Sequence, residues 1–176
     1  MFVYHCYSYM RLSVILFLFL LACKPAIVKD VSNTEKIDYS AMNLQASEMT
    51  LVGNAQEQAL EWPAFQDLIT GLENYDHSIG TTNSLITQVD KMLESPKEAF
   101  QDQSITSRIK VLKTRLHIYK SYLGYRIKTK EALELKYNYI IIALDELILQ
   151  INLRVNQLEK SNEQLLKELK EDLDPE

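Results

Sequence analysis

The sequence predicts an all-α protein: an antiparallel three-helix bundle or a helical hairpin with coiled-coil-like seams, preceded by a flexible tether. Two observations lead to this prediction. Apolar residues recur at alternating steps of three and four over much of the chain after residue 63, as expected of helices that bury one face. The 176 residues include only four Gly and four Pro, which argues against a loop-rich or β-rich fold.

The first recognisable element is an apolar run from Leu12 to Leu21. Arg11 precedes the run and Ala22-Cys23 follows it, an arrangement typical of a secretory signal peptide. The run has about half of the roughly 20 apolar residues that a membrane-spanning helix needs. We therefore expect a signal peptide over residues 1–22. Met10 is a candidate for the true start, because the residues before it do not resemble the beginning of a signal peptide.

The segment Leu20-Leu21-Ala22-Cys23 resembles the lipobox of bacterial lipoproteins, although Leu21 replaces the smaller residue that is usual at its place. The resemblance implies cleavage before Cys23, diacylglycerol on its thiol, and an acyl group such as palmitate on its new amino group. Two or more acyl chains give lasting membrane attachment. The resemblance thus implies a membrane-anchored lipoprotein of the bacterial cell envelope. Lys24 favours the outer over the inner membrane if the organism is Gram-negative.

Residues 24–54 show no sustained apolar period and are rich in polar side chains. We expect residues 23–54 to form the lipidated end and a flexible tether. A helical domain over residues 55–176 follows. Its first helix, over 55–61, should end at Trp62 because a residue before proline disfavours the α conformation.

A longer helix is predicted from Pro63 to Glu94, with a break near Ser78 to Thr82 where Gly and β-branched residues weaken it. Ser95, Pro96 and Glu98 then match an N-cap, a first helical turn and the third position of a capping box. This pattern predicts a helix over residues 96–128 that packs antiparallel to the helix before it.

The last predicted helix, over 130–173, carries a long apolar seam with one polar member, Asn162. A buried Asn can fix the register or oligomeric state of a coiled coil, whereas a frayed helix end would leave it in water. Gly124 and Lys128-Thr129-Lys130 are the only turn candidates before this helix, and Thr129 could cap it. The alternative to this hairpin is one continuous rod. The seam comprises Tyr137, Ile141, Leu144, Ile148, Ile151, Val155, Leu158, Asn162, Leu165 and Leu169.

Charge is sorted along the chain although the whole carries 24 acids against 19 Lys and Arg. Between residues 104 and 130 there is no acid. Packing between acidic neighbours could explain this basic helix, since charge pattern selects helix partners. Alternatively, its free face binds an anion such as a lipid headgroup or a cell-wall polymer. The candidate anion or partner contacts are Arg108, Lys110, Lys113, Arg115, Lys120, Arg126, Lys128 and Lys130.

No catalytic motif is found, and we expect neither an enzyme nor a cofactor. Glu73, Asp76 and His77 could share a helix face, but the spacing of di-metal bundles is absent, so no metal site is predicted and His77 is interpreted as part of a solvated helix end. Tyrosines lie among the basic residues, yet an exported acidic protein is not expected to bind nucleic acid.

The sequence therefore favours a lipid-anchored envelope protein that binds or spaces other components without catalysis. The membrane, through the anchor, and a protein of the envelope are the expected partners, and the C-terminal helix is a candidate for homo-oligomerisation. The alternative is an anion-binding module that docks residues 104–130 on headgroups or wall polymer. A metal-dependent helical-bundle enzyme ranks third.

Overall fold

The computed structural model describes residues 37–173. This part of the chain contains α-helices, two short 3-10 helices and no β-strand, so the all-α class is confirmed. None of its helices combines the length and the apolar character that crossing a bilayer would require. The elements are η1 (Tyr39–Ala41), α2 (Asn54–Leu60), α3 (Pro63–Glu73), α4 (Ile79–Glu94), η2 (Glu98–Phe100), α5 (Gln103–Leu123) and α6 (Lys130–Leu173).

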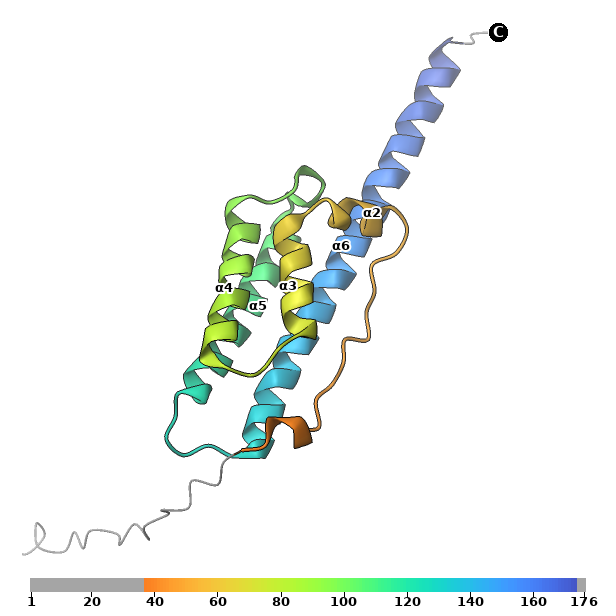
Figure 1. Ribbon diagram of the computed structural model, residues 1–176. Helices are drawn as coiled ribbons and strands as arrows, with labels where there is room; N and C mark the ends of the chain where they lie inside the picture. The colour runs from red at the N-terminus through yellow and green to blue at the C-terminus, as the bar shows by residue number, and fades with distance from the viewer. Residues whose placement is uncertain (1–36, 174–176) are drawn as a thin grey trace, which may run out of the picture. The chain divides into compact units, whose positions relative to one another are not determined.

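Helices α3, α4, α5 and α6 pack each against the next, and the short α2 lies across α3 and α6 (Figure 1). The specific three-helix arrangement is not confirmed, because the segment predicted as one helix with a break forms two helices. The break lies at 74–78, slightly before the predicted position. Ser78 then caps α4 by accepting a hydrogen bond from the backbone N–H of Thr81 at 3.1 Å, as short hydroxyl side chains commonly do.

The predicted helix start at Pro96 is wrong. Helix α5 begins at Gln103, where the Asp102 carboxylate accepts the backbone N–H groups of Ser104 (2.8 Å) and Ile105 (3.3 Å). The linker before it is held by Phe100, which is 1% exposed and packs against Trp62 at a ring separation of 5.2 Å. Phe100 ends the short 3-10 helix η2, so the linker that buries its ring is not α-helical, and this packing overrides the local capping signal.

The chain turns back between α5 and α6, which excludes the continuous rod. Arg108 of α5 pairs with Glu146 of α6, and Arg115, further along α5, lies over the ring of Tyr139, earlier in α6. The two helices are therefore antiparallel. Thr129 accepts the backbone N–H of Ala132 at 3.2 Å, so it caps α6 as predicted.

Helix α6 is 44 residues long and plays two roles. From Leu133 to Val155 its inner side chains are buried in the bundle. Beyond Leu158, every side chain as far as residue 170 is exposed, including Asn162. The helix thus continues past the bundle into solvent (Figure 1), and the seam residue Asn162 has no buried position within the described chain.

Candidate ligand-binding pocket

A pocket of about 700 Å³ lies between α3 and α6. It forms there because α3 packs mainly on α4, and α6 packs mainly on α5. Its volume falls within the range of about 300–1,000 Å³ that is usual for small-molecule sites. The walls are mostly apolar: α3 contributes Phe65, Ile69 and Leu72, and α6 contributes Tyr137, Ile141, Leu144 and Ile148.

The third wall is an extended segment, residues 42–52, which we call the strap. Side chains from one stripe of α6 accept hydrogen bonds from its backbone N–H groups. Glu134 accepts from residue 43 (2.7 Å), Asn138 from residue 45 (3.1 Å), Asp145 from residues 48 and 49 (3.3 and 3.4 Å) and Asn152 from residue 52 (3.1 Å). Residue numbers increase in the same direction along the strap and along its partners on α6, so the strap runs parallel to α6.

This finding corrects the tether predicted for residues 23–54. Its part from residue 37 onward is held along α6, and Met49 and Leu51 of the strap line the pocket. Asn152 also donates to the Thr50 carbonyl at 2.9 Å, so one amide satisfies two strap backbone groups. The prediction failed because the partners lie 91 to 102 residues away along the chain, and no local period marks such a segment.

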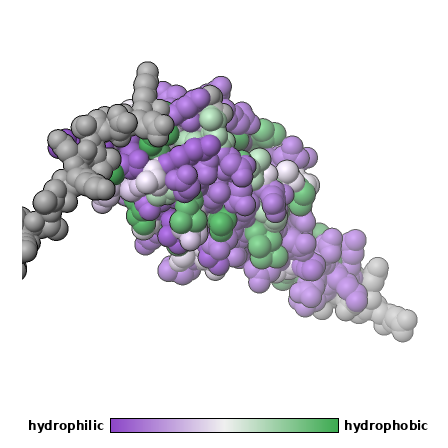
Figure 2. Space-filling view, turned by 90° about the horizontal axis from the view of Figure 1, so that it is seen from below, coloured by the Kyte–Doolittle hydropathy of each residue, from purple (hydrophilic) through white to green (hydrophobic). Residues whose placement is uncertain are grey.

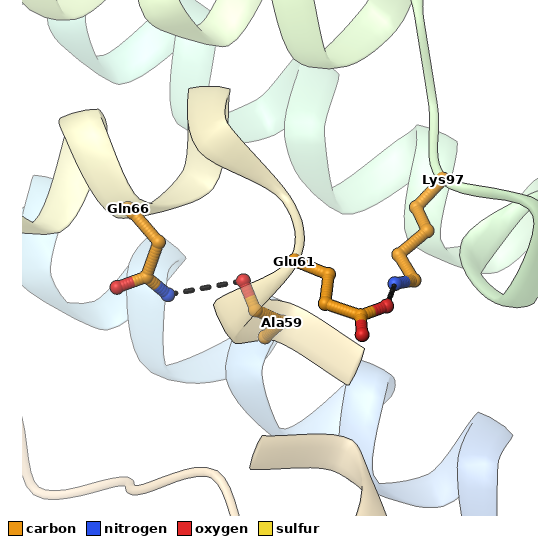
Figure 3. A network of polar contacts seen from close by, with 4 residues as sticks. All are labelled: Ala59, Glu61, Gln66 and Lys97. Carbon is orange, nitrogen blue, oxygen red and sulfur yellow. Dashed lines mark hydrogen bonds and ion pairs between the residues drawn. The ribbon is translucent and has the colours of Figure 1, made fainter. Parts of the chain in front are cut away.

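Residues on both sides of the corner between α2 and α3, among them Leu60 and Phe65, line the pocket, and Figure 3 shows the polar contacts at this corner. Gln66, a lining residue of α3, donates its side-chain amide to the Ala59 carbonyl of α2 at 3.0 Å. Lys97 of the α4–α5 linker pairs with Glu61 beside this corner at 2.5 Å. The hydrogen bond from Lys97 lowers the pKa of Glu61. Because Glu61 is exposed, we expect this pair to orient the corner rather than to stabilise it strongly.

An aromatic cluster contains Tyr137, a lining residue of the pocket. Its other members are Tyr39, Tyr75, His77 and Tyr119. The His77 ring is stacked on Tyr39 at 5.5 Å, and its Nδ1 is hydrogen-bonded to the Tyr119 hydroxyl at 2.8 Å. His77 has a φ of 58°, a left-handed conformation that is uncommon outside glycine. This backbone turn directs the ring into the cluster.

The interpretation of His77 as part of a solvated helix end is therefore wrong, since the residue is 8% exposed. Burial lowers the pKa of His77, partly offset by the neighbouring Asp76 carboxylate. Burial likewise raises the pKa values of Tyr75, Tyr119 and Tyr137. Burial thus favours the neutral forms of His77, Tyr75, Tyr119 and Tyr137. Within the described residues, no group of three or more potential metal ligands converges, and Asp76 instead binds Ser78 and Thr81.

Five of the eight basic residues predicted as contacts have partners within the described chain. Arg108 and Lys113 pair with Glu146 and Asp90, and Lys130 pairs with Glu134. Arg115 lies over Tyr139, and Lys128 donates to the carbonyls of Leu123 and Tyr125. The side chains of Lys110, Lys120 and Arg126 have no ion pair or hydrogen bond to the described part of the chain. Cys23, the predicted lipidation site, lies outside the described residues.

The pocket and the strap were missed by sequence reasoning. A usable signal was present, because Glu134, Asn138, Asp145 and Asn152 follow steps of four and seven along one stripe of α6. Polar acceptors at such spacing mark a second functional stripe beside the apolar seam.

Figure 2 shows one face of the molecule, where apolar side chains lie in separate patches among polar ones.

No family model, curated protein or solved structure matches the chain. The assignment of a function therefore rests on the residues and geometry described above.

We expect the free energy of unfolding to fall as the pH drops below about 6.5, with a contribution from His77. The folded-state pKa of His77 lies below its ordinary value of 6.5, so the unfolded chain binds the proton first. Stabilisation is then complete above the ordinary pKa and declines below it. Asn tolerates the left-handed backbone, so His77→Asn should flatten the pH dependence measured by urea denaturation.

His117→Asn is the matched control, because His117 is exposed on α5. It should leave the pH dependence unchanged. Equal slopes for the wild type and His77→Asn between about pH 5 and 7 would contradict the assigned role of His77.

Proposed function

We propose that this chain is a lipid-anchored protein of the bacterial cell envelope that binds an apolar ligand without catalysis. The observation that carries the proposal is the pocket of about 700 Å³ between α3 and α6, closed on one side by the strap. Its volume and apolar walls suit a small molecule or an acyl chain. The pocket supports the binding role suggested by the sequence.

The chemistry of the lining supports a ligand with an apolar chain and a neutral or cationic head. Among the described lining residues, Glu73 is the one charged side chain. Asp145 holds the strap beside the same pocket. These carboxylates would repel a carboxylate or phosphate head, whereas polar atoms of Gln45, Ser47 and Gln66 could bond a hydroxyl or ester group. A neutral single-chain acyl lipid fits this description.

A photoreactive monoacylglycerol tests the pocket in the full-length protein purified in detergent. Mass spectrometry should find the cross-links on residues that line the pocket. Ile69→Trp would fill the space with a larger side chain, and we expect cross-linking there to fall at least about five-fold, a loss of roughly 1 kcal/mol in binding.

Ile142→Trp is the control, because Ile142 is 45% exposed on α6 and does not line the pocket. This variant should be cross-linked in the pocket to the same extent as the wild type. Cross-links spread over the outer surface, or unchanged by Ile69→Trp, would exclude the pocket as the binding site.

The anchor is supported by the lipobox-like segment that ends at Cys23. Labelled palmitate should be incorporated into the protein in a bacterial host, and the protein should fractionate with membranes. Cys23→Ala should abolish the labelling, because the thiol that receives diacylglycerol is gone. Cys6→Ala should keep it. Persistent labelling of Cys23→Ala would sink the lipoprotein assignment.

A second candidate function is anion docking through the side chains of Lys110, Lys120 and Arg126, the members of the predicted basic set that have no partner in the described part of the chain. Soluble poly(glycerol phosphate) should then bind, and its affinity should drop steeply with salt because exposed charges are screened beyond about 10 Å at 0.1 M. Replacing all three with Gln should remove this binding, whereas Lys160→Gln/Lys170→Gln should not. Binding that is absent, or insensitive to salt, rejects this function.

A further inference from the structure

We propose that the projecting part of α6, residues 156–173, forms an antiparallel coiled coil with the same segment of a second copy of this chain. The helix leaves the bundle after Val155, which is 5% exposed. Leu165, Leu166 and Leu169, further along, are 56 to 58% exposed. An isolated helix of this length is marginal in water, so a partner that covers these leucines would stabilise it.

The apolar pattern of the projecting part continues the buried seam without a change of phase. Ile148, Ile151 and Val155 are buried, and the next members at steps of three and four are Leu158, Asn162, Leu165 and Leu169. These are the a and d positions of a heptad repeat, the positions that meet a partner helix. The described elements of the chain, residues 37–173, cover the seam up to Val155 and leave it open beyond.

The end of the covered seam at Val155 determines how the two helices of the dimer are oriented. Consider a second helix that runs parallel to the first and in register with it. Its residues before 156 would then lie against the seam face of the first helix, in the space that α2 and α3 occupy. An antiparallel partner instead places its own bundle beyond the free end of the first helix. The two bundles then lie at opposite ends of the coiled coil and do not collide.

The residues match in this alignment. Leu158 of each copy faces Leu169 of the other, and Asn162 faces Leu165. The two Asn162 side chains lie in adjacent layers near the twofold axis, where a polar residue can fix the register. Residues 156–173 carry five acidic residues and three Lys, a net charge of −2, and salt screens the resulting repulsion between the two copies.

The expected dimer is weak. Two short segments bury on the order of 1,000 Å² in total, at the lower limit for specific association. Dimerisation should therefore depend on protein concentration. Attachment of both copies to one membrane would favour it by raising their local concentration, but the pairing itself requires neither the lipid anchor nor an occupied pocket.

Light scattering on the full-length protein in detergent, over a range of concentrations, gives the number of chains per particle. We expect a reversible monomer–dimer equilibrium in the wild type. Leu165→Asp/Leu169→Asp should raise the dissociation constant at least about 100-fold, a change of roughly 2.7 kcal/mol, because it places four carboxylates in the dimer seam. Both leucines are exposed in the single chain, so the fold should be unaffected.

Leu153→Asp is the matched control: Leu153 is 53% exposed on the same helix, but it lies opposite the seam. This variant should dimerise like the wild type. A wild type that stays monomeric at all concentrations, or a double variant that still dimerises, overturns the proposal.

A photoreactive amino acid at position 169 tests the orientation. In the antiparallel pair it should capture residues near Leu158 of the second copy. Capture near position 169 would show a parallel pair and would overturn the antiparallel assignment. Neither result depends on ligand binding, so this test and the test of the pocket can fail independently.

Discussion

Burial of one face of α6 is the constraint on which the rest of the structure depends. Leu133, Ile140, Leu147 and Ile151 are fully buried, and withdrawing such side chains from water is the largest favourable term in folding. Helix α5 packs antiparallel on this face, α4 packs on α5, and α3 packs on α4. Because α3 packs mainly on α4 rather than on α6, the α3 side of α6 is left without close helix packing, and the pocket forms there.

The strap completes this side of α6 by a different kind of interaction. It lies extended, so its backbone N–H groups have no helical partners and must find other acceptors. The polar stripe of α6 provides them. Hydrogen bonds that are partly open to water contribute about 0.5–1.5 kcal/mol each at most, less than the packing that holds the helices. Met42, Leu44, Met49 and Leu51 of the strap add apolar packing against the core.

Local signals predicted the elements well where no distant residue competed with them. Thr129 caps α6 because a hydroxyl before a helical run needs only its own neighbours. The capping pattern at Ser95 failed, because Phe100 is drawn into the core beside Trp62. His77 looked like a residue of a solvated turn. Its ring is buried because tyrosines from α5 and α6 converge on the α3–α4 connection.

The helical class and the positions of the apolar seams follow from the sequence, because periodicity is a property of neighbouring residues. The sequence favoured a hairpin of the last two helices but left a continuous rod open, and the contacts between α5 and α6 exclude the rod. Tertiary contacts also make residues 42–52 a strap, form the pocket behind it, and end the cover of the α6 seam by the described residues at Val155. These features depend on contacts between segments as many as 102 residues apart. No local pattern records which segment covers a helix face, or where that cover ends.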